Sequence, residues 1–356
     1  MIDTFLFDGE LALLAHRLAE TADLVDSFVI VEGGETFRGA PKPLIFAEQR
    51  DSFAAFADKI RHVALPRLGG AAATPWDRER VQRDAVQFAL QDLDPDDVVL
   101  ILDADEIPSR GLLERLRGEG LDRPRRLLMT RHYEALDLLA PRSPCCPDPH
   151  EASAAAHRRL RPGRWDRLDI DWFSRSGVAA PWRSIAGGGA RRSLHAVRRE
   201  TPAVGALPDA GRHLCFVDPA ARPARKLGRV AHAELAGRNA EAMVHLERCR
   251  AHGVHHRGWW FAERPLGPLP DDLERLAKRV PEIEHGRRLP IMARRRAARA
   301  WAWLRTLLPD ESVRAGDRIY GALLPLWTLV ELAARPIARL VRTRPRLSGS
   351  ANHFSA

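Results

Sequence analysis

The chain has 356 residues, of which 45% are hydrophobic and 29% are charged, a composition that indicates a globular protein and excludes a disordered or fibrous one. Its net charge of +9 is unevenly placed: residues 287–346 hold 14 Arg and four acids, a net of +10, which leaves −1 for the rest. The body of the chain is therefore neutral, which argues against a nucleic-acid-binding protein.

Predicted strands and helices alternate along the first 133 residues. Residues 2–7 and 27–32 are expected to be strands, separated by a helix over 10–22 whose leucines recur at helical spacing. A helix over 79–93 then precedes a strand over 98–102, and another strand is expected over 125–133. This alternation predicts an α/β fold with right-handed crossovers and a mixed, mostly parallel sheet flanked by helices.

The composition changes twice farther along the chain. Residues 141–190 are rich in Pro, Gly and Arg, which predicts long loops over the sheet edge. From residue 271 the pattern is helical and rich in Arg and Ala. We therefore expect a catalytic domain over 1–270, a basic amphipathic helical appendage over 271–346 and a disordered tail over 347–356.

The strand over 98–102 runs directly into three acids, Asp103, Asp105 and Glu106. Its five consecutive aliphatic residues predict burial on both faces, and ligands of open α/β sheets gather at the carboxyl ends of such strands. On an extended backbone, Asp103 and Asp105 point to the same face. Two carboxylates that converge there suit Mg²⁺ or Mn²⁺, whereas the alternative is a solvated acidic turn.

The spacing of the cysteines and the N-terminal sequence indicate in which cell compartment the protein is expected. The four cysteines are Cys145, Cys146, Cys215 and Cys249, and they include no Cys-x-x-Cys pair of the kind that binds zinc in fingers. Reduced thiols in a cytosolic protein are the expected state. The start "MIDTFLFDGE" is not typical of a signal peptide, and no run of about 18 apolar residues predicts a transmembrane helix.

Several motifs in one order resemble glycosyltransferase family 17, the family of the bisecting N-acetylglucosaminyltransferases of animals. They are "DTFLFDGELALLAHRL", "VDSFVIVEGGETFRGAPKPL", "WDRERVQRDA" and "ILDADEIPS", followed by "DAGRHLCFVDPAARPARKLGRVAHAEL". The resemblance extends over about residues 3–235. The chain departs from the family at Arg212, where a Trp is usual, and at Asp218–Pro219, where a Gly is expected. These departures concern acceptor recognition.

The resemblance implies a metal-dependent, inverting glycosyltransferase of the GT-A fold. It would move a hexose or N-acetylhexosamine from a nucleotide sugar, with UDP-N-acetylglucosamine as the expected donor, to a glycan or lipid-linked acceptor. Asp105 is expected to bind Mn²⁺ or Mg²⁺ directly. Asp103 would reach the metal through water or contact the ribose, and Glu106 would brace the loop or simply enter the next helix. His232 is expected as a further metal ligand and His213 as a ligand or substrate-binding residue, the alternative for each being a packed or surface histidine.

The resemblance also implies a set of donor-binding residues. Glu32 would accept a hydrogen bond from the base or ribose, and Thr36 and Lys42 lie in a Gly-rich loop that would close over the nucleotide, unless Lys42 is a solvated charge. Arg80 and Arg83 lie nearly one helical turn apart and would steady the diphosphate or form an exposed basic face. The base is left open among three acids, Glu134, Asp137 and Asp209.

The basic segment over 287–346 carries Trp and Leu on helical faces opposite Arg. Such helices bind anionic membrane surfaces, so the expected location is cytoplasmic, with docking on the inner face of the plasma membrane or packing on the catalytic domain as alternatives. Two other functions stay open: a non-catalytic membrane-peripheral scaffold, and a haloacid-dehalogenase-like phosphatase, which also places Asp-x-Asp after a buried strand.

Overall fold

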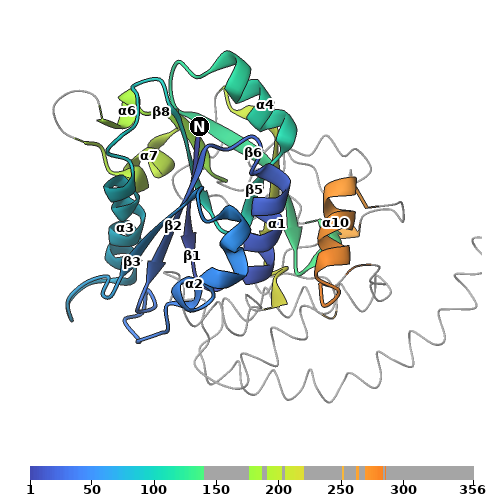
Figure 1. Ribbon diagram of the computed structural model, residues 1–356, viewed down its shortest axis with the longest axis horizontal. Coiled ribbons are helices and arrows are strands. Elements are labelled where there is room, and N and C mark those ends of the chain that lie inside the picture. The colour runs from blue at the N-terminus through green and yellow to red at the C-terminus, as the bar shows by residue number, and fades with distance from the viewer. Residues whose placement is uncertain are drawn as a thin grey trace, which may run out of the picture.

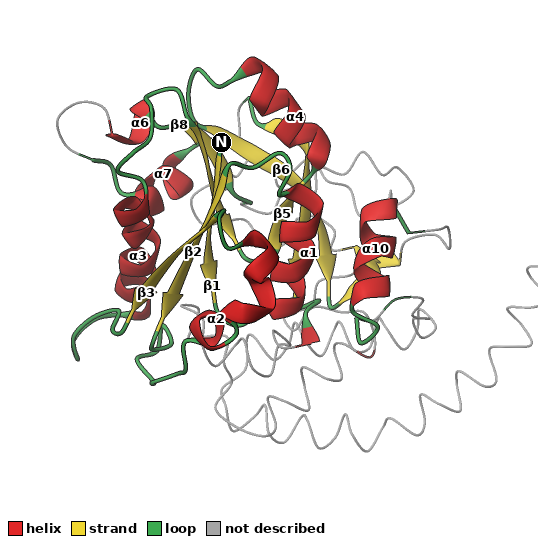
Figure 2. Cartoon of the chain, viewed as in Figure 1, coloured by secondary structure: helices red, strands yellow, loops and turns green. Residues whose placement is uncertain are grey.

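The computed structural model describes residues 1–139, 176–186, 191–202, 205–219, 251, 262–263, 269–283 and 285. Strands and helices in this part form a mixed sheet with helices packed on it (Figures 1 and 2). The strands are β1 (Ile2–Phe7), β2 (Ser27–Gly33), β3 (Ile60–Leu65), β4 (Val98–Asp103), β5 (Glu106–Pro108), β6 (Arg125–Tyr133), β7 (Ala135–Leu139), β8 (Val178–Pro181), β9 (Leu207–Cys215) and β10 (Ala262–Glu263). The helices are α1 (Leu11–Thr21), α2 (Ile45–Glu48), α3 (Pro75–Asp84), α4 (Arg110–Glu119), α6 (Arg183–Ala186), α7 (Leu194–Glu200) and α10 (Asp271–Arg279), with 3-10 turns η1 (Arg50–Phe56) and η2 (Ala85–Ala89).

The sheet has the strand order β10-β7-β6-β8-β4-β1-β2-β3, and β9 pairs with both β5 and β6. Strands β3, β2, β1 and β4 are parallel, whereas β8 runs antiparallel between β4 and β6. Phe7 lies opposite Glu32, and Leu6 lies opposite Asp103, so these strands end at one edge. The predicted α/β fold with a mixed sheet flanked by helices is confirmed, but the sheet is not mostly parallel, because five of its nine described strand pairings are antiparallel.

Two apolar layers cover the sheet, because alternate residues of each buried strand face opposite sides. On β2, Phe28 and Ile30 pack toward one layer and Val29 and Val31 toward the other. The first layer includes residues of α1, α2 and α4, and the second includes residues of η2, α6 and α7. Both faces of β4 are therefore buried in apolar layers, and its last residue, Asp103, is the part of the strand that is partly exposed.

Two sequence predictions need correction within the described residues. Residues 178–181 were expected in a loop over the sheet edge, but they form β8 inside the sheet, where Val178 lies opposite Ile101. The helix expected over 79–93 begins earlier and ends as a 3-10 turn. It starts at Pro75 because Thr74 and Asp77 form a reciprocal capping box.

The C-terminal predictions fall mostly outside the described residues. Helix α10 begins at Asp271, where the helical pattern was expected to begin, whereas residues 287–346 and 347–356 lie outside the described part. The GT-A classification and the domain division stay predictions. Among the described helices, none is long and apolar enough to cross a membrane.

Candidate functional site

Asp103 ends β4 between two arginines that come from different elements. Arg83 of α3 places Nη2 2.8 Å from Oδ1, and Arg198 of α7 places Nη2 2.7 Å from Oδ2. Partial burial on its own would raise the pKa of Asp103, but Arg198 and Arg83 hold that pKa far below its usual value. The carboxylate is therefore ionised, with 37% of the side chain exposed.

Glu106 is fully buried and fastens the loop that follows β4. Its Oε2 accepts a hydrogen bond from the Asp103 backbone N–H at 2.9 Å, and Arg198 donates to both carboxylate oxygens at 2.8 and 2.9 Å. The expectation that Glu106 braces the loop through the backbone agrees with this geometry. Arg198 thus connects Asp103 to Glu106.

The same loop is held from the other side by Arg17 of α1. Arg17 and Asp3 are both fully buried and form a two-pronged ion pair, with each nitrogen–oxygen distance 2.7 Å. The remaining guanidinium nitrogen donates to the carbonyls of Asp103 and Ala104 at 3.1 and 3.4 Å. A buried charge from β1 and α1 therefore fixes where the acidic turn begins.

Asp105 lies at the centre of a second cluster with His213 and Cys215 of β9. Their ligand atoms all lie within 4.8 Å of one another, and His213 Nε2 is 3.6 Å from Asp105 Oδ1. The Asp105 backbone carbonyl also accepts a hydrogen bond from the Leu214 N–H at 2.7 Å. Arg131 of β6 donates from Nε to the Cys215 sulfur at 3.2 Å.

Charge separation within this cluster shifts two pKa values. Burial lowers the pKa of His213, but the neighbouring Cys215 and Asp105 outweigh it and raise the pKa to about 9. Burial raises the pKa of Cys215, whereas Arg131 and His213 lower it, and the net shift is downward. Both shifts have one cause, the attraction between the sulfur and the cationic groups beside it.

Strand β9 reaches this place because Gly211 permits a close approach to β5. Gly211 has φ +140°, and a Cβ there would lie 2.1 Å from the Ile107 carbonyl oxygen. The resulting antiparallel pairing sets His213 opposite Glu106 and Gly211 opposite Pro108. His213 Nδ1 lies 3.9 Å from Glu106 Oε1, so its two ring nitrogens face two carboxylates.

The expected nucleotide-binding residues of the β2 region are placed at the same sheet edge. Glu32 is fully buried, and its oxygens accept hydrogen bonds from the Phe46 and Ala47 N–H groups at the start of α2. The Thr36 hydroxyl accepts from the Ala40 N–H at 3.2 Å, and Lys42 pairs with Asp8 at 3.0 Å. Lys42 is 5% exposed, so it is not a solvated charge.

The side chains of Arg80 and Arg83 point to different places although both residues lie on α3. Arg83 is 3% exposed and faces Asp103, whereas Arg80 is 54% exposed and pairs with Asp77 at 3.4 Å. Only Arg83 therefore belongs to the acidic edge. The predicted metal ligand His232 lies outside the described residues.

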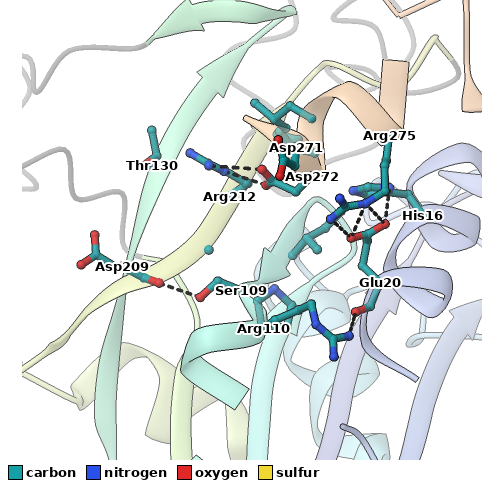
Figure 3. A pocket seen from close by; sticks show the side chains of 15 residues that line it. His16, Glu20, Ser109, Arg110, Thr130, Asp209, Arg212, Asp271, Asp272 and Arg275 are labelled. Atoms are coloured by element: carbon teal, nitrogen blue, oxygen red, sulfur yellow. Dashed lines mark hydrogen bonds and ion pairs between the residues drawn. The ribbon is translucent and has the colours of Figure 1, made fainter. Parts of the chain in front are cut away.

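A pocket of 310 Å³ opens between β5, β9, α1, α4 and α10 (Figure 3). Arg212 and Leu214 line it, so it lies on the opposite face of β9 from His213 and Cys215. Arg212 pairs with Asp272 at 3.0 Å, and the Asp209 carbonyl accepts from the Ser109 hydroxyl at 2.7 Å. Of the three acids weighed as base, Asp209 lines this pocket. Glu134 instead follows Tyr133, the β6 partner of Cys215.

Sequence reasoning missed three members of the site: Cys215, Arg131 and Arg198. Cys215 was weighed only for disulfide or finger pairing, and arginines are too frequent in this chain to single out. The one available signal was the spacing His213-x-Cys215, which on a strand directs both side chains to one face.

Comparison with known proteins agrees with the motifs. Residues 1–133 match glycosyltransferase family 17. The resemblance expected from the motifs is thereby confirmed for this family 17 segment, which contains Asp103, Asp105 and Glu106, while β9 lies beyond it.

Three curated relatives share this segment. They are named beta-1,4-mannosyl-glycoprotein 4-beta-N-acetylglucosaminyltransferase and come from Rattus norvegicus, Homo sapiens and Mus musculus. Each is 36% identical over 118 residues, which make up 31% of this chain and 22% of the relative. The similarity thus spans less than a quarter of the length of these relatives.

Proposed function

We propose that the chain is an inverting glycosyltransferase that moves a hexose or N-acetylhexosamine from a nucleotide sugar to a glycan or lipid-linked acceptor. UDP-N-acetylglucosamine is the proposed donor, because the relatives that share the family 17 segment are named N-acetylglucosaminyltransferases. The observation that carries the proposal is the Asp103–Asp105–Glu106 turn at the carboxyl end of β4, held from three sides within that segment.

The residues of the turn have different roles in the proposed reaction. Asp105 would hold the divalent cation, for which the Asp-x-Asp pattern predicts Mn²⁺ or Mg²⁺. Such a cation, when bound, neutralises charge on a departing diphosphate. Asp103 would orient the ribose or a metal-bound water, and Arg83, which already contacts Asp103, would lie next to the diphosphate.

The buried pairs around the turn would supply preorganisation. Arg17 and Glu106 hold the backbone of Asp103 by hydrogen bonds that no substrate has to form. Groups that are already oriented need no reorganisation as charge develops, which is the main source of electrostatic stabilisation in enzymes. The GT-A classification is part of this proposal and rests on the Asp-x-Asp turn at the edge of the parallel strands.

The test is a panel of nucleotide sugars in which release of the nucleoside diphosphate is measured with wild type and with Asp105→Asn. We expect turnover with UDP-N-acetylglucosamine, and a fall in kcat of about 10²–10³-fold in the variant, since one preorganised electrostatic partner is removed. Asp94→Asn is the matched control, because Asp94 is an exposed acid in the turn before the same strand.

The outcomes separate the functions that the sequence left open. No binding of any nucleotide sugar or of UDP by the folded protein would overturn the proposal and leave the non-catalytic scaffold. Turnover confined to GDP- or dTDP-sugars would overturn the donor. Hydrolysis of simple phosphate esters in place of sugar transfer would favour the phosphatase.

A further inference from the structure

The Asp105–His213–Cys215 cluster has a mixed set of donor atoms. A carboxylate oxygen comes from the turn after β4, and a ring nitrogen and a sulfur come from alternate residues of β9. All three lie within 4.8 Å of one another. Neither Cys215 nor this combination follows from an Asp-x-Asp motif, which offers oxygen donors alone.

The spacing suits a tetrahedral ion. Ligand bonds of about 2.0–2.3 Å at tetrahedral angles put neighbouring donor atoms ~3.3–3.6 Å apart. His213 Nε2 and Asp105 Oδ1 already lie 3.6 Å apart, and the widest pair in the cluster has about an ångström to close.

The ligand atoms are largely buried. Cys215 and Asp105 are each 5% exposed, and Arg131 already lies 3.2 Å from the sulfur, so a bound ion would add to the positive charge that is present there. Glu106 Oε1 lies 3.9 Å from the other nitrogen of His213, Nδ1, so it would have to approach by about an ångström before a hydrogen bond could orient a metal-binding imidazole. Arg131 contacts the sulfur and would act as a second hydrogen-bonding neighbour of the site.

The donor set decides the class of ion. Thiolate and imidazole favour zinc and its transition-metal neighbours, whereas Mg²⁺ prefers oxygen and near-ideal octahedral geometry. We propose that Asp105, His213 and Cys215 bind a thiophilic divalent transition-metal ion, best fitted by Zn²⁺, in a three-ligand site that excludes Mg²⁺. Three protein ligands leave a fourth position for an exchangeable group, as in catalytic zinc sites.

This inference deepens the proposed function, on which it rests only for what the ion would do in the reaction. It differs from the expectation of Mn²⁺ or Mg²⁺ drawn from the sequence: this site would retain Mn²⁺ more weakly than Zn²⁺ and would not retain Mg²⁺.

The test uses the full chain stripped of metal and titrated with Co²⁺, whose thiolate complexes have an intense near-ultraviolet charge-transfer absorption. We expect one equivalent to bind with that absorption, Zn²⁺ to displace it, and a 100-fold excess of Mg²⁺ to leave it unchanged. Cys215→Ser should abolish the absorption and weaken Zn²⁺ binding by about 10–100-fold or more. Cys249→Ser, at another cysteine of the chain, should leave both unchanged.

Thermal unfolding in EDTA serves as the control for correct folding. Wild type and Cys215→Ser should unfold at the same temperature in EDTA, and only wild type should gain stability from Zn²⁺. If Cys215→Ser is unstable in EDTA, His213→Gln serves as the second variant. Equal Co²⁺ absorption in wild type and Cys215→Ser, or displacement by Mg²⁺, would overturn the proposal.

The failure of each proposal can be told apart. Co²⁺ binding without turnover of any nucleotide sugar would sustain the metal site and overturn the transferase. Turnover that is unaffected by EDTA, in protein that binds no Co²⁺, would sustain the transferase and overturn the metal site.

Discussion

Arg17 and Asp3 form the most deeply buried ion pair that holds the acidic turn. Both side chains are 0% exposed, and the pair lies between α1 and β1. Removal of one partner from such a pair leaves an uncompensated buried charge, which costs more than the pair itself contributes. The cost should therefore appear as lost stability and as a displaced turn, because Arg17 also donates to the Asp103 carbonyl.

We predict that Arg17→Met lowers the free energy of unfolding by about 3–5 kcal/mol, as measured by urea denaturation. Arg110→Met is the matched control. Arg110 makes the same two-pronged contact with Asp23, at 2.7 and 2.6 Å, but the pair is exposed, so a loss of less than about 1 kcal/mol is expected.

The double variant Asp3→Leu/Arg17→Met separates stability from positioning. It should recover most of the lost stability, since no unpaired charge remains, while sugar transfer stays reduced because the turn has lost its donor. Full recovery of transfer by the double variant would show that Arg17 does not position the turn.

At the level of single residues, the sequence predicted where the acids lie but not what surrounds them. A strand-end Asp-x-Asp locates Asp103 and Asp105, because the apolar run before them has only one plausible place in an α/β sheet. The sequence did not predict that Asp103 would be held by Arg198, since 95 residues separate them and their contact depends on how α7 packs. Glu32 illustrates the same limit, because its carboxylate is directed at the start of α2.

Among the elements, β9 determines whether the two halves of the site meet. Gly211→Ala would place a Cβ 2.1 Å from the Ile107 oxygen at a φ of +140°, so β9 would have to move away from β5. We predict a loss of at least about 2 kcal/mol in unfolding free energy, with weakened Co²⁺ binding. Gly118→Ala in α4, where a Cβ meets nothing within 4 Å, should be neutral or stabilising. Equal effects of the two variants would contradict this role of Gly211.

Helix α10 packs on α1 through a charged cluster next to the pocket of Figure 3. Arg275 and Arg279 both contact Glu20, at 2.6 and 2.9 Å, and Arg279 donates to His16 Nδ1 at 2.9 Å. Burial lowers the pKa of His16 to about 4; Glu20 and Asp272 oppose that shift, whereas Arg279 and Arg275 add to it.

This pKa predicts a specific pH dependence of stability. Because the folded protein keeps His16 neutral down to about pH 4, its contribution is complete above the unfolded pKa of 6.5 and is lost as the pH falls from 6.5 toward 4. The unfolding free energy should fall by on the order of 2–3 kcal/mol over that window. In His16→Asn, which keeps an acceptor for Arg279, this part of the fall should disappear. A variant that parallels wild type from pH 6.5 to 4 would refute the assignment.

Sequence periodicity predicted the elements of the first half better than those of the second. Strands β1, β2, β4 and β6 and helix α1 were predicted close to their bounds because each carries its own apolar pattern. Strand β8 has only the four residues Val178–Pro181, and it becomes a strand because β4 and β6 leave a place between them. Pairing with distant strands overrides local composition, and a short stretch of sequence holds no information about that pairing.

Over the whole molecule, charge is distributed unevenly: the segment over 287–346 has a net charge of +10, whereas the rest of the chain is nearly neutral. We propose that this segment docks the protein on anionic lipid, near a lipid-linked acceptor. In vesicle co-sedimentation, replacement of Arg294, Arg295 and Arg296 by Gln should weaken binding to anionic vesicles, since each Arg at such a surface contributes about 1 kcal/mol. Added salt should weaken the wild type as well.

The matched control is the replacement of three arginines of the body, Arg117, Arg123 and Arg192, which are 53%, 66% and 47% exposed. These changes remove the same charge and should leave binding nearly unchanged. Equal losses from the two triple variants, or equal binding to neutral vesicles, would show that net charge rather than this segment is responsible.

The pairing of β9 with β5 also imposes an order in time. Asp105 leaves the ribosome roughly a hundred residues before His213 and Cys215, which at about 5–20 residues per second is a delay of about 5–20 s. During that interval the nascent sheet has the acid but not the imidazole or the thiol, so it has no means of selecting one ion over another. Selectivity for the ion would thus be acquired only after β9 has been synthesised and has paired with β5.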